Sequence, residues 1–167
     1  GTMEVLLVSP FNPFLVIIAK AIPFLLLSIV NLSVILILSV TLLDMPINGS
    51  ISLLFAESIL LIITALSLGL LISNVAQSQQ AAMLISLMGM LVPTMLFTGF
   101  MFPIENMAVP LQVICNIIPA KWNYTIVKSI MIKGLGFSAI WKETLVLFGM
   151  TVFLLVVSFK KFKTRLV

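Results

Sequence analysis

Residues 58–104 read SILLIITALSLGLLISNVAQSQQAAMLISLMGMLVPTMLFTGFMFPI and carry no charged side chain. Residues 21–43 and 144–159 are also uncharged. A helix needs roughly 20 apolar residues to cross the hydrocarbon core of a bilayer. These stretches therefore predict membrane-spanning helices, and the first is long enough that one crossing cannot account for it.

The composition supports the same fold class. Hydrophobic residues make up 62% of the chain and charged residues 8%, whereas a soluble domain has about 25% charged residues. We expect an all-α integral membrane protein that forms a single membrane domain over residues 1–167. The basic residues do not alternate with aromatic ones, which argues against a nucleic-acid partner. One cysteine and no histidine exclude a disulfide within the chain and leave a zinc cluster without ligands.

Polar segments divide the apolar sequence into four expected transmembrane helices. The turn-forming residues 44–50 and the polar run 74–80 separate the first three. Residues 103–139 contain three prolines and only short apolar patches, which predicts an outer re-entrant helical hairpin. The expected transmembrane helices cover residues 14–43, 51–73, 80–102 and 140–159.

Four crossings place both ends of the sequence on one side of the membrane. The basic tail, residues 160–167, predicts that this side is cytoplasmic. Four lysines then lie on the outer side, so the numbers of basic residues on the two sides are nearly equal. We give the tail more weight, because its basic residues are clustered and the outer lysines are spread along a longer segment. The predicted location is the cell (inner) membrane, with several crossings.

The opening residues, 1–10, differ from the apolar stretches. Thr2 can cap a short helix and Pro10 can end it, and this helix is too short to cross a bilayer. The residues alone predict either a surface helix at the membrane edge or a simple leading segment of the first span.

A resemblance favours the first alternative. The pattern Gly-Thr-x-Glu-x-Leu-Leu-x-Ser-Pro resembles the cytoplasmic loop of the permease subunits of type-2 ABC exporters. Further stretches resemble later parts of bacterial multidrug-type members of that family, in the same order, namely residues 73–82, 99–107, 118–122 and 133–136. In this family the loop is a coupling helix, here residues 1–12, that docks on a separate ATP-binding subunit. By resemblance, the docking residues are Gly1, Thr2, Glu4, Leu6, Leu7, Ser9 and Pro10.

The resemblance also implies the remaining parts of an exporter. ATP and magnesium would bind to the partner subunit, and a second permease, identical or a sibling, would complete the transporter. The hairpin would supply an outer gate that includes Gly99, Phe102, Pro103, Glu105 and Pro119. One departure from the family pattern is that Ala108 and Val109 precede Pro110. Another is that the family has six spans, which predicts that this sequence is the C-terminal part of a longer chain.

Two polar residues in the expected spans mark a candidate substrate path. Glu57 is the one acidic residue within a span, and Asn31 is polar at mid-depth. Carboxylates inside membranes are costly and are often functional, but Glu57 is close enough to the outer end to reach the interface, and Asn31 can serve helix packing instead. The expected substrate is a hydrophobic or amphipathic molecule, drug-like or lipid-like.

Other classes of function remain as alternatives. A channel or an ion-driven carrier without an ATPase would need polar groups along a path at mid-depth, for which Asn31 and Glu57 are thin support. An intramembrane enzyme would need at least two convergent reactive groups, and the sequence offers no evident pair. The phosphate-binding pattern Gly-x-x-x-x-Gly-Lys-[Ser/Thr] is absent from residues 1–167, so we expect a transport subunit without an ATP site of its own.

Overall fold

A computed structural model describes residues 13–165, and every regular element in this range is a helix. The two longest helices, each of 29 residues, come first and last in the described range. In chain order the helices are α2 (Pro13–Thr41), α3 (Ile51–Val75), α4 (Gln79–Ser86), η1 (Leu87–Leu91), α5 (Val92–Phe97), η2 (Ile104–Asn106), α6 (Val109–Cys115), α7 (Pro119–Met131) and α8 (Phe137–Arg165).

Four stretches of the described chain are long and apolar enough to cross a membrane, as the sequence predicts. They are Ile18–Thr41, Ile51–Val75, Gln79–Phe97 and Phe137–Lys160. The third stretch ends at Phe97 rather than at residue 102, because Gly99 adopts a left-handed backbone with φ 86° and turns the chain. The last helix begins at Phe137 and continues to Arg165, past both expected ends.

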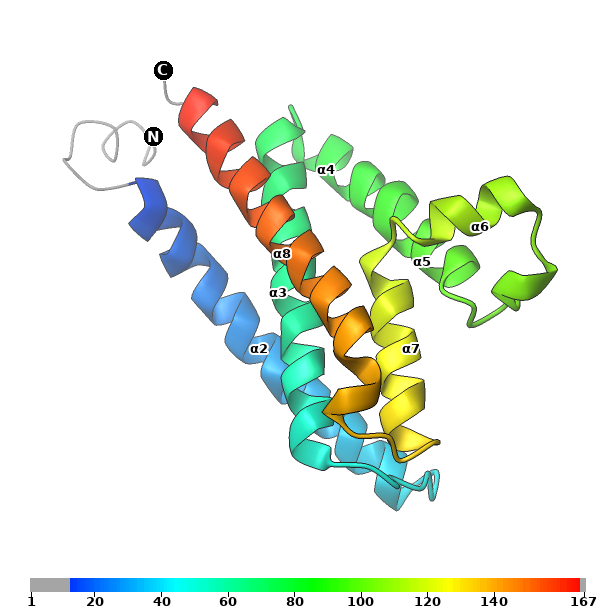
Figure 1. The fold of residues 1–167 in the computed structure, drawn as a ribbon. Helices are drawn as coiled ribbons and strands as arrows, with labels where there is room; N and C mark the ends of the chain where they lie inside the picture. The colour runs from blue at the N-terminus through cyan, green and yellow to red at the C-terminus, as the bar shows by residue number, and fades with distance from the viewer. Residues whose placement is uncertain (1–12, 166–167) are drawn as a thin grey trace.

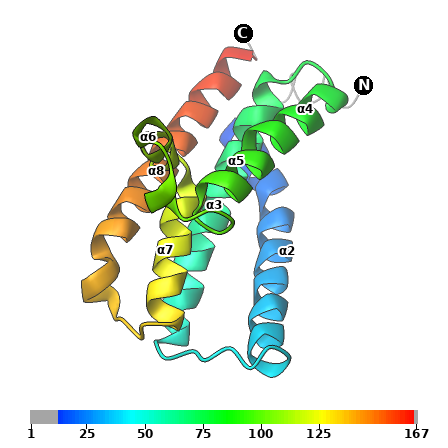
Figure 2. The same cartoon turned by 90° about the vertical axis from the view of Figure 1, so that its right-hand side faces the viewer.

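Three helices form the centre of the bundle. α3 packs along α8 over most of its length, and α7 packs against both of them. Helix α2 lies at the edge of the bundle, and α4, η1 and α5 extend to the other side (Figures 1 and 2). The buried apolar residues come from α3, α7 and α8, namely Leu54, Ile126, Ile130, Met131, Ile140 and Leu147.

Serine side chains cap the N-terminal ends of two helices. The Ser50 Oγ atom accepts a hydrogen bond from the Leu53 amide at the start of α3, and Ser78 Oγ accepts one from the Ala81 amide at the start of α4. Both are ordinary N-caps, which satisfy amide groups that the helix itself leaves free. The turn between α3 and α4 thus falls within the polar run that the sequence predicts to be a break.

The third apolar stretch is not a regular α-helix. Its middle segment, η1, is a π-helix, in which the Val92 amide donates to the carbonyl oxygen of Leu87, five residues earlier. Pro93 follows directly, and a proline inside a helix lacks an amide hydrogen and crowds the carbonyl four residues before it. The wider π turn accommodates this crowding. Bulges of this kind are frequent at functional sites.

The loop between α2 and α3 is fastened to the end of α7. The Asn48 amide donates to Met131 O over 3.1 Å, and its side-chain Nδ2 donates to Ile132 O over 3.1 Å. Gly134 ends α7 in a left-handed conformation, φ 64°, and its amide bonds to Ile130 O over 3.2 Å. This loop therefore caps the carbonyl groups that the end of α7 leaves unpaired.

Candidate functional site

The predicted docking residues lie outside the described range. Gly1, Thr2, Glu4, Leu6, Leu7, Ser9 and Pro10 all precede Pro13, where the description begins. Their role and the coupling helix over residues 1–12 stay predictions from the sequence. In the described part of the chain, the first residues of α2 and the last residues of α8 lie at the same end of the bundle (Figure 1).

The predicted outer-gate residues fall in two places. Gly99, Phe102, Pro103 and Glu105 lie in the turn between α5 and η2 and in η2 itself. Pro119 occupies the start of α7 instead. The two places are near each other at Gly99, where an added Cβ atom would lie 3.9 Å from Tyr124 Cε1 of α7. Glu105 and Phe102 are exposed. Phe102 and Pro103, in the turn between α5 and η2, line a surface hollow together with Phe97.

The two residues of the candidate substrate path are not brought together. Asn31 is exposed on α2, and its side chain makes no hydrogen bond within the described residues. Glu57 is 4% exposed and lies between α3 and α8. The structure therefore separates an exposed amide at the edge of the bundle from a buried carboxylate at its centre.

Glu57 belongs to a row of polar contacts between α3 and α8. The Thr144 hydroxyl donates to Glu57 Oε1 over 2.8 Å, and the hydroxyls of Thr64 and Thr151 are 2.6 Å apart. Further along, Asn74 Nδ2 donates to Ser158 O over 3.3 Å. The numbers rise together on both helices, so the two helices run parallel. We call this row the α3–α8 polar seam.

The spacing of the seam explains its regularity. Glu57 and Thr64 are seven residues apart, and so are Thr144, Thr151 and Ser158. A repeat of seven keeps one face of a helix directed at a parallel partner. Hydroxyl residues let membrane helices approach closely and hydrogen-bond across the contact. The sequence reasoning missed Thr64, Thr144 and Thr151, although the seven-residue spacing of hydroxyl and carboxyl groups was a signal that could have found them.

The seam leaves some buried oxygen atoms without partners in the described chain. Glu57 Oε2 is one, and Ser158 Oγ is another. Buried polar groups that lack a hydrogen bond are costly, more so in a membrane-spanning segment. Two more buried oxygens without partners lie on neighbouring helices, on Asn123 of α7 and on Glu143 of α8. All three core helices, α3, α7 and α8, therefore carry a buried oxygen atom with no partner among the described residues.

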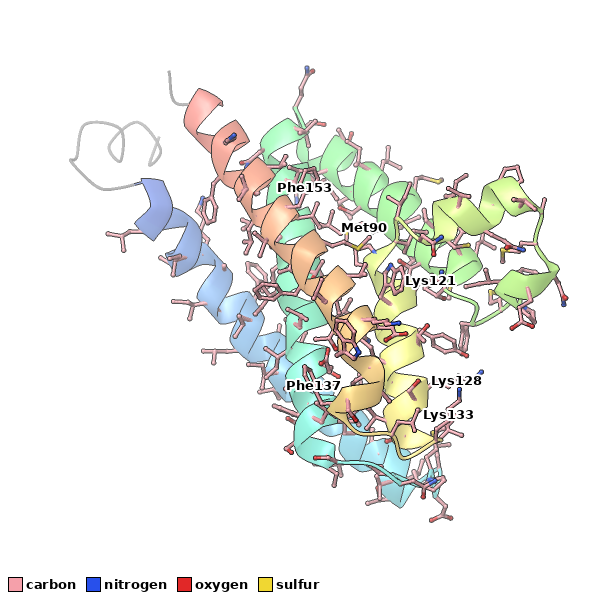
Figure 3. All side chains as sticks on the ribbon, in the orientation of Figure 1. Met90, Lys121, Lys128, Lys133, Phe137 and Phe153 are labelled. Atoms are coloured by element: carbon pink, nitrogen blue, oxygen red, sulfur yellow. The ribbon has the colours of Figure 1, made fainter. Side chains whose placement is uncertain are left out.

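On its other sides α3 borders several hollows, and three of them bear on the site. One lies between α2 and α3 and includes Lys20 and Ser28, and a second lies between α3 and α4. The third, of about 400 Å³, lies between α3, the π segment and the start of α7. Met90 extends from η1 into the space toward α3 (Figure 3). Thr64 takes part both in the seam and in the wall of this third hollow, so the two features are continuous.

The part of the chain that the structure describes shows no cluster of side chains that would hold a metal ion. Among residues 13–165 no three histidine, cysteine or acidic residues gather as metal ligands would. Cys115 is a free thiol, fully buried, with its Sγ 3.9 Å from Met107 Sδ. The candidate site therefore consists of the parallel helices α3 and α8, joined by polar contacts, with mostly apolar hollows beside α3.

Comparisons with known proteins agree on one family. The family model described as ABC-2 type transporter matches residues 1–132. Two Escherichia coli proteins, the probable multidrug ABC transporter permeases YbhS and YbhR, are 31% identical over 134 residues and 30% identical over 143 residues. These matches cover 80% and 86% of this chain, but 36% and 39% of the relatives.

A third E. coli relative has a more general name. The inner membrane transport permease YhhJ is 31% identical over 150 residues, which is 88% of this chain and 39% of YhhJ. The chain therefore spans little more than a third of the length of these relatives. No solved structure matches the chain.

Proposed function

The chain belongs to the ABC-2 type transporter family as a membrane permease, and from that premise we propose that it serves an ATP-driven exporter of hydrophobic or amphipathic molecules. The observation that carries the proposal is the family match over residues 1–132, which includes both the opening motif and three of the four candidate spans. The names of YbhS and YbhR support a drug-like substrate, and a lipid-like one has the same solubility in the bilayer.

The energy would come from a separate ATP-binding subunit, which would also hold the ATP and the magnesium. The docking residues proposed for it are those of the opening motif, with Glu4 and Leu7 as the charged and apolar anchors. We propose that this end of the bundle is cytoplasmic, together with the basic residues after Phe159. A second permease, a copy or a sibling, would complete the assembly.

The fold supports a simple path for the motion. Residues 1–12 lead directly into α2, and α2 lies at the edge of the bundle, against α3 and only slightly against α8. The core of α3, α7 and α8 is held by buried side chains and by the polar seam. A displacement of the docking segment would therefore move α2 against a core that stays together. Two bundle states with different affinity for the ATP-loaded partner are what such coupling requires.

We propose that the substrate moves along α2 and α3. Asn31 supplies an exposed amide on α2. Glu57 supplies a buried carboxylate in the core, where Thr144 holds one oxygen and the other has no partner among the described residues. The turn at Gly99–Glu105, with Pro119, would act as the outer gate. Its closeness to Tyr124 of α7 would link that gate to the core.

The test is ATP-driven uptake into inverted membrane vesicles that contain the full-length protein and its ATPase partner. A fluorescent hydrophobic amine should accumulate only when ATP is present, because an exporter moves its substrate from the cytoplasmic face to the lumen of such vesicles. Movement of ions or dye at the same rate without ATP would favour the channel or carrier alternative instead.

A further inference from the structure

The third hollow beside α3 has walls from three separate parts of the chain. The α3 helix contributes Leu61, Thr64, Ala65 and Leu68. The third apolar stretch contributes Gly89, Met90, Pro93 and Thr94, and the chain just before and at the start of α7 contributes residues 117–120. Its volume is about 400 Å³, within the roughly 300–1,000 Å³ that small-molecule pockets occupy. We call it the π-bulge pocket.

The sequence explains why the space is open. Gly89 has no side chain, and a Cβ atom placed there would meet nothing within 4 Å. The residues that face it include Ala65 and Ala120, which are small. Pro93 and the π turn before it widen the helix at the same level. Small residues on all walls and an irregular helix together leave a gap that the described side chains do not fill.

The lining determines which chemistry fits. None of the described residues that line the pocket is charged, so a charged group inside it would lose its hydration without a counter-ion among them. The Thr64 hydroxyl is already bonded to Leu60 O and to Thr151. The Thr94 hydroxyl makes no hydrogen bond within the described residues. Met90 adds a flexible thioether that can adapt to different shapes.

We infer that the π-bulge pocket binds an uncharged apolar group, alkyl or aromatic, of a molecule dissolved in the membrane. This inference rests on the proposed transport function and gives it a binding site for the apolar part of the substrate. The group can come from an exported molecule or from the acyl chain of a lipid, since both present the same hydrocarbon surface. Thr94 offers one hydrogen bond to a polar atom at its edge.

The test uses benzophenone, a small uncharged aromatic probe that attaches to methionine side chains when illuminated. It is applied to the full-length protein with its partners in phosphatidylcholine vesicles, and the labelled residues are mapped by mass spectrometry. Met90 should be labelled in a saturable way, so that an excess of diphenylmethane, which has the same two rings but no photoreactive carbonyl, protects it. Met88, which is 64% exposed on the same segment, should be labelled without saturation.

Variants with a matched control test the position of the site. Gly89→Phe fills the pocket and should lower Met90 labelling about tenfold, as expected for a tenfold weaker affinity. Gly149→Phe on α8 is the control, because a Cβ atom there also meets nothing within 4 Å and Gly149 does not line the pocket. Thr94→Val keeps the shape and should keep the labelling. Unsaturable labelling of Met90, or equal labelling in Gly89→Phe and the control, would overturn the inference.

Further arms separate the sources of the ligand and the two proposals. Protection of Met90 by diphenylmethane assigns the site to small membrane-dissolved molecules. Protection by diheptanoylphosphatidylcholine alone assigns it to lipid chains, and protection by neither contradicts the inference. If Gly89→Phe loses the labelling but keeps ATP-driven dye uptake, the pocket has no part in transport. If the parent protein shows saturable labelling but no ATP-driven uptake, the proposed function fails and the binding site stands.

Discussion

The hydroxyl groups of Thr64 and Thr151 lie 2.6 Å apart between two parallel helices. Each hydroxyl is also 2.8 Å from the carbonyl oxygen four residues earlier in its own helix, Leu60 O for Thr64 and Leu147 O for Thr151. Both residues are buried, Thr64 completely. The contact sits in the middle of the seam that joins α3 to α8. It helps to hold α3 against α8, and the proposed motion of α2 requires these two helices to stay together.

A double-mutant cycle measures the contact. We expect Thr64→Val and Thr151→Val each to lower the stability of the protein in detergent, with a coupling of about 0.6 kcal/mol, the average for hydrogen bonds between membrane helices. Thr41→Val is the control, because Thr41 is exposed and bonds only to Ile37 O of its own helix. Additive effects of the two seam variants would mean that the hydroxyls do not stabilise each other.

Replacement of Glu57 separates structure from function. Glu57→Gln keeps an oxygen that can accept from Thr144 and removes the cost of a buried carboxylate. We therefore expect thermal stability in detergent to be retained or raised, while ATP-driven dye uptake falls. A loss of stability with normal uptake would assign Glu57 to packing alone and remove it from the substrate path.

The turn after α7 predicts a large difference between two neighbouring glycines. Gly134 has φ 64°, and a Cβ atom there would lie 3.2 Å from Asn48 O. Gly134→Ala should lower the free energy of unfolding by about 1–2 kcal/mol, the cost of a left-handed backbone for other residues. Gly136→Ala is the control, because nothing lies within 4 Å of the added atom. Equal thermal shifts for the two variants would contradict the role of this turn as a cap of α7.

Orientation can be measured with single cysteines in a Cys115→Ser background. Gly136 directly precedes α8 and Gln77 lies in the turn between α3 and α4, and both are exposed. The start of α8 and the α3–α4 turn lie at opposite ends of the bundle (Figure 1). We expect a membrane-impermeant thiol reagent to label Gly136→Cys in intact cells, and Gln77→Cys only in inverted vesicles. The opposite pattern would place the basic tail outside and would require the docking proposal to be abandoned.

The four apolar spans are the part of the fold that the sequence predicts well. Gaps between charged residues located four stretches, because charge is excluded from the hydrocarbon core. The break at residues 74–80 was also readable, since Ser78 and its polar neighbours suit the start of a helix better than its middle. The sequence predicts that the third stretch ends at residue 102, five residues beyond its actual end at Phe97. The neighbouring residues give no signal that Gly99 adopts a positive φ.

The contacts within the site were harder to predict. Glu57 was singled out for its charge, but its partner Thr144 is 87 residues away, and helix pairing at that distance follows from packing rather than from local sequence. Pro93 indicated an irregularity without showing that it would take the form of a π turn. The sequence pairs Asn31 and Glu57 only as polar residues at depth, whereas the bundle leaves Asn31 exposed on α2 and buries Glu57 between α3 and α8.

The central claim, that this permease works with a separate ATPase, is tested most directly by affinity purification of the full-length protein from its native membrane. Glu4→Arg and Leu7→Asp are purified beside it, with Gly149→Ala as a control away from the docking motif. We predict that an ATP-binding subunit accompanies the parent and the control, and is lost from the two motif variants. Absence of any ATPase from the parent under mild detergent, or its undiminished presence in both motif variants, would contradict the account.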